Sequence, residues 1–317
     1  MHKLSHNNVA GFFLSLNAAL MWGMLPIVIK ELLAGMDATT VVWYRFLVAG
    51  IVLGLWLLVT RKLPPLLQVT STIRWLLLIA ALSLSVNYFL FSYSLNYVNA
   101  ETSEAVIQLT TLFLILGGVV FYKEPFFAVQ KIGTLLIVMG LLLFFHDRFA
   151  ELGSLENRQT TGVIIVVFAA ITWVVYALLQ KQLLRYFSSV QILFFIYLFA
   201  IVLLLPFIHP ASLFQLSKFH FWLLVFCCAN TLIAYGSFAE ALNCWEASKV
   251  SAVLAPLFTI GSLKLIVWFY PDYAFSDRLS LLSILGALLL VVGSVLTALV
   301  PLIYQRRLDR LANVTSQ

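Results

Sequence analysis

Charged side chains are scarce in this 317-residue chain. Asp, Glu, Lys and Arg make up only 10% of its residues, whereas 62% are hydrophobic and the mean hydropathy is +1.02. A soluble domain carries about 25% charged residues, because it needs them to cover its surface. The scarcity of charge therefore excludes an ordinary soluble domain and predicts an integral membrane protein.

Residues for metal, disulfide or nucleotide chemistry are few as well. Of the three cysteines, Cys227 and Cys228 are adjacent and Cys244 lies close by, a spacing that suggests neither a disulfide nor a metal site. The five histidines form no motif, and the chain contains neither an HExxH sequence nor a Walker-type glycine loop. We therefore expect no metal, no cofactor and no use of ATP.

Catalytic clusters are also missing from the apolar runs, so we predict that the chain is not an enzyme. Two rivals from other classes stay open, an intramembrane enzyme and a sensor. The enzyme would need grouped acids, histidines or an activated serine, which the runs do not offer. The sensor would need a soluble domain, and the tail 304–317 is too short for one.

The apolar runs are long, and some are apolar on all sides, such as residues 46–59. Only helices and closed barrels can span a bilayer, and barrel strands would alternate with period two. The runs therefore predict an all-α integral membrane protein with ten transmembrane helices. We place them at residues 9–30, 39–59, 73–96, 101–122, 125–145, 161–182, 189–208, 219–243, 247–270 and 279–300.

The longest polar connection, 147–160, divides these helices into two sets of five. We accordingly predict a first five-helix repeat over 1–146, a connecting loop over 147–160, a second repeat over 161–303 and a cytoplasmic tail over 304–317. Cytoplasmic segments of membrane proteins are enriched in Lys and Arg. With a cytoplasmic N-terminus, twelve of the 19 Lys and Arg residues fall on inner segments and five on outer ones. This asymmetry predicts that both termini are cytoplasmic, and it accounts for the +6 net charge without a nucleic-acid partner.

The two halves resemble each other in sequence. "AALMWGMLPIVIKELL" (18–33) shares six of its sixteen letters with "AAITWVVYALLQKQLL" (169–184), including Trp22 with Trp173. Three further matches pair Glu101 with Glu246, Gly133 with Gly286, and Gly140 with Gly293. Because five helices is an odd number, the second half enters the membrane with the opposite orientation. The pattern predicts an inverted repeat, an arrangement that suits alternating access. A duplicated helical bundle without transport activity would show the same sequence similarity.

Several of these segments resemble one known family. "YRFLVAG" (44–50) and "GGVVFYKEPFFAVQKIGTLLIVMGLLL" (117–143), which carries Glu124, look like the EamA family of the drug/metabolite transporter superfamily. Asp277 stands in a longer segment where that family often has Glu. The resemblance implies ten helices and the export of small polar metabolites, such as amino acids or related compounds, across the bacterial inner membrane. A drug or nucleotide-type solute carrier is the alternative.

Ionisable residues inside a span are costly and usually face a cavity or a partner. Arg45 and Lys264 both lie about 9 Å from the outer ends of their helices, and Trp22 lies about 12 Å from its end. Glu104 and Gln108 enter from the same side, so one layer would hold all five residues. Lys264 would bind a carboxylate or phosphate or carry a proton, unless it snorkels outward. Arg45 would line the substrate site, pair with Glu104 or a helix-end carbonyl group, or snorkel to the surface.

The partners we expect are the lipid bilayer and a small-molecule substrate, with both a monomer and a homodimer left open. Prolines 26 and 256 predict kinks in their helices. The residues that we predict to line the substrate site are Lys264, Trp22, Gln108, Arg45, Glu104, Trp173, Tyr176, Asn87 and Tyr235.

Overall fold

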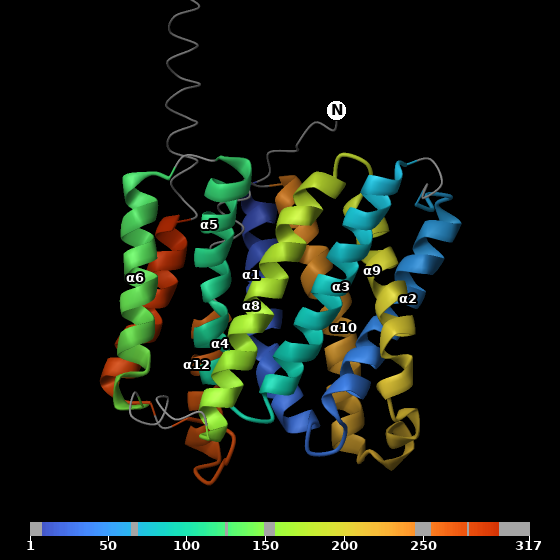
Figure 1. The fold of residues 1–317 in the computed structure, drawn as a ribbon. Helices are drawn as coiled ribbons and strands as arrows, with labels where there is room; N and C mark the ends of the chain where they lie inside the picture. The colour runs from blue at the N-terminus through green and yellow to red at the C-terminus, as the bar shows by residue number, and fades with distance from the viewer. Residues whose placement is uncertain are drawn as a thin grey trace, which may run out of the picture.

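The computed structural model describes residues 8–64, 69–123, 126–148, 156–244, 255–277 and 279–297, and none of these forms a strand. Glu124, Glu246 and the tail 304–317, which entered the sequence predictions, lie outside these ranges, as does the side chain of Pro256. The described helices stand side by side, at different depths in the view, as one bundle (Figure 1).

The first half contains α1 (Asn8–Leu32), α2 (Ala38–Val59), α3 (Ser71–Ser94), α4 (Ala100–Ile107), α5 (Leu109–Tyr122) and α6 (Ala128–Phe144). The short helix η1 (His146–Arg148) follows α6. The second half contains α8 (Arg158–Leu183), α9 (Ser189–Leu204), η2 (Leu205–Phe207), η3 (Pro210–Gln215), α10 (Lys218–Cys244) and α12 (Ala255–Phe269). An unlabelled helix, Leu281–Thr297, is the last one described.

Seven helices among the described residues are long and apolar enough to cross a membrane, with α4 and α5 counted as one stretch. Three more are apolar but shorter: Ala128–Phe144, Phe258–Phe269 and Leu281–Thr297. Two predicted spans, 101–122 and 189–208, agree closely with the candidate spans Ala100–Tyr122 and Ser189–Phe207, but neither is one continuous α-helix. The helix expected over 101–122 is interrupted by a turn at Gln108, and α9 ends at Leu204, just before Pro206, which lacks an N–H for the helix to use.

Polar contacts gather several helix termini at one end of the bundle, the lower end in Figure 1. Near the end of α1, Lys30 Nζ donates to the carbonyl oxygens of Leu95 and Val98, which follow α3. At the start of α8, Arg158 donates to the carbonyl oxygen of Asn96 at 2.6 Å. Because α1 ends where α8 begins, these two helices run in opposite directions.

The helices pack in matched pairs. α1 packs along α10 as α3 packs along α8, and α2 packs along α9. The largest apolar core lies among α2, α3, α8 and α9, with Phe46, Leu84 and Tyr197 fully or almost fully buried. This core therefore joins helices from the two halves.

Glycines bring α6 and the helix 281–297 into backbone contact. A Cβ atom on Gly133 would lie 2.7 Å from the carbonyl oxygen of Gly293, and one on Gly140 would lie 2.8 Å from that of Gly286. The earlier glycine of each helix thus faces the later glycine of the other, so the two helices are antiparallel. Only glycine permits so close an approach.

Pro26 lies inside α1, where it removes the hydrogen bond that the carbonyl group of Trp22 would accept. Neighbouring carbonyls of this turn accept side-chain donors from the second half. Asn230 Nδ2 of α10 donates to Met21 O, and Thr259 Oγ1 of α12 donates to Gly23 O at 2.6 Å. The weakened turn of α1 is therefore held by both of its neighbours.

Candidate functional site

A buried cation lies where α2, α3 and α10 meet. The Arg45 side chain is on α2 and is only 2% exposed. Its Nε donates to Thr231 Oγ1 of α10 at 3.0 Å, and its guanidinium carbon lies 4.7 Å from the ring centroid of Tyr88 on α3. Such a stacked contact stabilises a desolvated guanidinium group without neutralising its charge.

Aromatic rings extend this group across the seam between the halves. Tyr88 stacks on Tyr235 with centroids 6.1 Å apart, and Trp22 meets Tyr235 edge-on at 5.5 Å. Trp173 approaches the Tyr235 hydroxyl group. We call Arg45, Tyr88, Thr231, Tyr235, Trp22 and Trp173 the Arg45 cluster. Its members come from five helices, and the sequence-matched pair Trp22 and Trp173 flanks one ring.

The Arg45 cluster lacks an acidic partner among the described residues, because the ion pairs found there do not involve Arg45. The pairing of Arg45 with Glu104, one sequence expectation, is absent. The buried hydroxyl groups of Tyr88, Tyr197 and Tyr235 approach one another beside the guanidinium group. An unneutralised guanidinium group favours a ligand with a carboxylate or phosphate.

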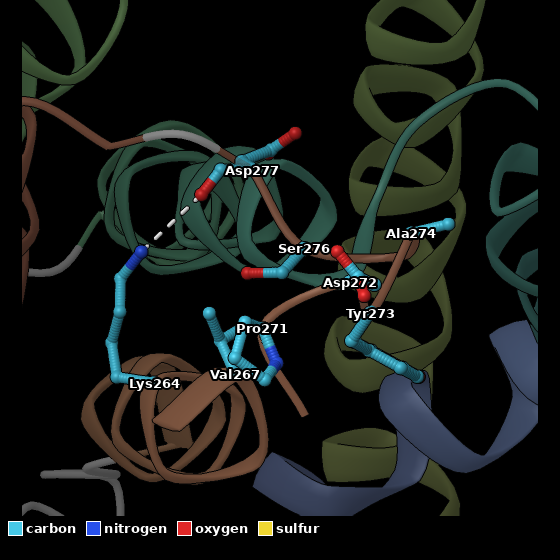
Figure 2. A pocket seen from close by; sticks show the side chains of 8 residues that line it. All are labelled: Lys264, Val267, Pro271, Asp272, Tyr273, Ala274, Ser276 and Asp277. Carbon is cyan, nitrogen blue, oxygen red and sulfur yellow. Dashed lines mark hydrogen bonds between the residues drawn. The ribbon is translucent and has the colours of Figure 1, made fainter. Parts of the chain in front are cut away.

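Lys264 lies elsewhere, in a pocket formed by α12 and the segment that follows it (Figure 2). Its Nζ donates to the backbone carbonyl of Asp277 at 3.3 Å. The pocket has a volume of about 440 Å³ and is lined by Lys264, Val267, Pro271, Asp272, Tyr273, Ala274, Ser276 and Asp277. The single polar layer expected from the sequence is therefore divided, with Lys264 apart from the Arg45 cluster.

The carboxylate of Asp277 ties the segment after α12 to the start of α4. It accepts hydrogen bonds from Thr102 Oγ1 at 2.6 Å and from Asn99 Nδ2 at 3.1 Å. Arg148 lies 3.4 Å from the same carboxylate and donates to Thr102 Oγ1 at 3.2 Å. Asp277 is only 8% exposed, so these buried contacts join α4, the segment after α6 and the segment after α12 at the lower end of the bundle.

A second carboxylate completes this connection. Glu101 Oε1 accepts from Ser276 Oγ at 2.7 Å and from the backbone N–H of Asp277 at 3.1 Å. We call Asn99, Glu101, Thr102, Arg148, Ser276 and Asp277 the end clamp. Beside it, Tyr273 donates to Glu31 of α1, and burial together with that carboxylate raises the pKa of Tyr273, so it stays a donor.

The remaining predicted site residues hold helices together or lie apart. Asn87 Nδ2 donates to the carbonyl oxygen of Ala169 at 2.8 Å, joining α3 to α8. Gln108 accepts from Ser294 Oγ at 3.1 Å, and Tyr176 packs in the largest core. Glu104 is 5% exposed and has no partner among the described residues.

Several residues of this region were not predicted from the sequence. Tyr88 and Thr231 carry no charge and follow no motif, so nothing in the chain distinguished them from ordinary core residues. The end clamp was missed because the hydrogen bonds from Ser276 and Thr102 each join residues 175 positions apart in sequence. Its one signal was the match of Asp277 to a family position that often holds Glu.

Comparison with known proteins identifies the family. The sequence model of the EamA-like transporter family matches residues 9–146 and 160–299. The chain therefore belongs to the EamA-like transporter family and is a multi-pass membrane transporter.

The chain is also similar to two transporters and to one solved structure. An uncharacterized transporter of Haemophilus influenzae is 40% identical over 291 residues, which cover 91% of this chain and 94% of the relative. The uncharacterized inner membrane transporter YhbE of Escherichia coli K12 is 39% identical over 293 residues, or 91% of each chain. A crystal structure with 14% identity has a TM-score of 0.59 over 92% of this chain and 98% of its own, so it shares the fold alone.

Proposed function

We propose that this transporter exports small metabolites that carry a carboxylate group, foremost amino acids or related compounds, across the bacterial inner membrane by alternating access. The observation that carries the proposal is Arg45, which is 2% exposed and has no acidic partner among the described residues. A substrate carboxylate would form paired, charge-assisted hydrogen bonds with the guanidinium group. The rings of Trp22, Trp173 and Tyr235 would enclose the rest of the molecule.

The proposal includes ten membrane spans in two inverted five-helix repeats, with both termini cytoplasmic. Three observations support this arrangement. The contacts of α1 with α10 correspond to those of α3 with α8, which are the equivalent helices when the halves are exchanged. α6 and the helix 281–297 meet antiparallel. α1 ends at the end of the bundle where α8 begins.

A site between two such halves can face either side of the membrane in turn, because similar halves of opposite orientation offer two comparable packings. In this arrangement the end clamp closes the side that we predict to be periplasmic. We propose that Lys264, in the pocket beside the clamp, attracts the anionic group of the substrate on its way out.

Counterflow in proteoliposomes tests the function. Vesicles holding the purified protein are loaded with a mixture of unlabelled amino acids, and uptake of the same labelled amino acids is followed. We expect transient accumulation that needs the internal amino acids and that amines lacking the carboxylate do not inhibit. No accumulation with any amino acid, or competition by the amines, would contradict the proposal. Competition by nucleotides alone would favour the nucleotide-type carrier, whose bases would stack on the same rings.

A further inference from the structure

Glu104, on α4, is a buried carboxyl group without a partner. The residue is 5% exposed, and among the described residues it accepts no hydrogen bond and pairs with no cation. Glu101, one turn earlier, is fully buried, but its Oε1 accepts two hydrogen bonds, and only its Oε2 lacks a partner. Enclosing an ionised carboxylate without compensation costs so much free energy that the group takes up a proton instead.

The surroundings of Glu104 follow from the register of its neighbours. Ala100, one turn before it, packs against Ile27 of α1 and Leu263 of α12. Residues four apart lie on one face of a helix, so Glu104 also faces α1 and α12, one turn further from the end clamp.

On the two facing helices, the corresponding residues one turn further from the clamp are Gly23 and Thr259. They are joined by the hydrogen bond from Thr259 Oγ1 to Gly23 O. This is the turn of α1 that Pro26 weakens. Glu104 therefore faces the turn of α1 from which Pro26 removes a backbone hydrogen bond.

The cations on the helices around Glu104 are engaged elsewhere. Lys30 of α1, Lys264 of α12 and Arg158 of α8 each donate to backbone carbonyls near the end clamp, and Arg148 after α6 faces Asp277. The cation within α6, Lys131, lies over the ring of Phe126 before its start. Two other carboxylates belong to the end clamp, Glu101 and Asp277. Each accepts a hydrogen bond within the clamp. The closed arrangement therefore leaves a proton as the means of neutralising Glu104.

We propose that Glu104 is the proton-binding site of the transport cycle. The carboxylate takes up one proton from the periplasmic side as α1, α4 and α12 close over it, and the acid releases that proton to the cytoplasmic side when the other end of the seam opens to water. Each cycle then moves one proton inward as substrate moves outward, so an inward proton gradient drives export. This inference rests on the proposed transport function and adds the coupling ion to it.

The test compares the wild-type protein with Glu104→Gln, Glu104→Asp and the control Glu156→Gln, whose side chain is exposed before α8. Proteoliposomes are assayed with labelled amino acids in two ways, by counterflow at equal pH and by accumulation under a pH difference. With one proton per substrate, a difference of one pH unit gives a concentration ratio of about tenfold. We expect this ratio for the wild-type protein, Glu104→Asp and Glu156→Gln, whereas Glu104→Gln keeps counterflow and shows no accumulation.

Three results would overturn the inference: accumulation by Glu104→Gln, loss of its counterflow, or a wild-type protein that shows counterflow but ignores the pH gradient. The last leaves the proposed function intact. If the wild-type protein shows neither activity, the proposed function fails, and infrared spectroscopy still decides the proton. The carbonyl band of a protonated carboxylic acid should be present at neutral pH in the wild-type protein and missing in Glu104→Gln. An identical band in both proteins, or none in either, overturns the assignment.

Discussion

Gly140 and Gly286 touch backbone to backbone, since a Cβ atom on Gly286 would lie 2.6 Å from the carbonyl oxygen of Gly140. In the sequence comparison of the halves, Gly140 matches Gly293 rather than Gly286. The predicted inverted repeat requires this arrangement, because exchanging the halves would then exchange the two glycine pairs. The close contact is therefore compatible with the proposal that α6 and the helix 281–297 are equivalent elements.

Gly286→Ala should destabilise the protein. The new methyl group would lie 2.5 Å from the backbone nitrogen of Phe144, so the helices must separate, at a cost of about 1–3 kcal/mol. Thermal unfolding in detergent measures the loss. Gly261→Ala is the matched control, because a Cβ atom there meets nothing within 4 Å and alanine is the better helix former. Equal unfolding temperatures for the two variants would contradict the close contact.

Arg45→Gln should lower the rate of counterflow by at least about tenfold, which corresponds to about 1.4 kcal/mol of lost binding. Arg45→Lys should fail as well, because an ammonium group cannot stack on Tyr88 and bind a carboxylate with two parallel hydrogen bonds. Arg185→Gln, at an exposed position after α8, is the control and should transport normally. Normal counterflow by Arg45→Gln would remove Arg45 from the substrate site.

Lys264→Met should slow transport without abolishing it, because Lys264 lines the end pocket and not the Arg45 cluster. We expect a higher substrate concentration for half-maximal rate when substrate enters from the clamp side, and an unchanged value from the other side. Initial rates in vesicles of known orientation give both values. Flux that is unchanged in both directions would exclude Lys264 from the transport path.

Asp277→Ala should lower stability by about 1–3 kcal/mol, because it leaves Asn99, Thr102 and Arg148 without their buried acceptor. The unfolding temperature in detergent reports this loss. Asp272→Ala provides the comparison, since Asp272 lies in the same segment with an exposed side chain. If both variants unfold at the same temperature, the end clamp contributes nothing to stability.

Cysteines introduced at Lys62 and Glu156 should be labelled from opposite sides of the membrane. Lys62 follows α2 at its far end, whereas Glu156 precedes α8 at the end of the bundle that holds the clamp. Impermeant maleimide, applied to cells carrying a variant without the natural cysteines, should modify Glu156→Cys and spare Lys62→Cys. Labelling of both positions from outside would refute the predicted orientation.

The sequence predicted the helical class and the family, because long apolar runs and repeated glycines are local signals that survive without coordinates. It also named Arg45, Trp22, Trp173 and Tyr235 as candidate site residues, and these four lie together in the structure, while their role in binding stays a prediction. It did not separate Lys264 from this group. Depth along a helix can be counted from the sequence, whereas the lateral position of a helix in the bundle depends on packing between distant segments.

The sequence also could not predict which polar side chains form hydrogen bonds or ion pairs with each other. The bond from Asn99 to Asp277 joins residues 178 positions apart, and neither residue belongs to a periodic pattern. The expectation that Arg45 would pair with Glu104 rested on equal depth alone, and α1 and α4 place Glu104 on another face of the seam. Opposite charges at one depth are therefore weak evidence for contact in a bundle of this size.

The glycine contact of α6 with the helix 281–297 lies at one edge of the bundle, and α2 with α9 lies at the other (Figure 1). Backbones locked this tightly resist sliding, so a relative rotation of the halves would pivot there. Displacement grows with distance from a pivot, so the widest arc would be swept by α2, the helix that carries Arg45. A tilt of a few degrees at the glycine contact would thus displace α2 by several ångströms. The seam beside Arg45 would open by a similar distance.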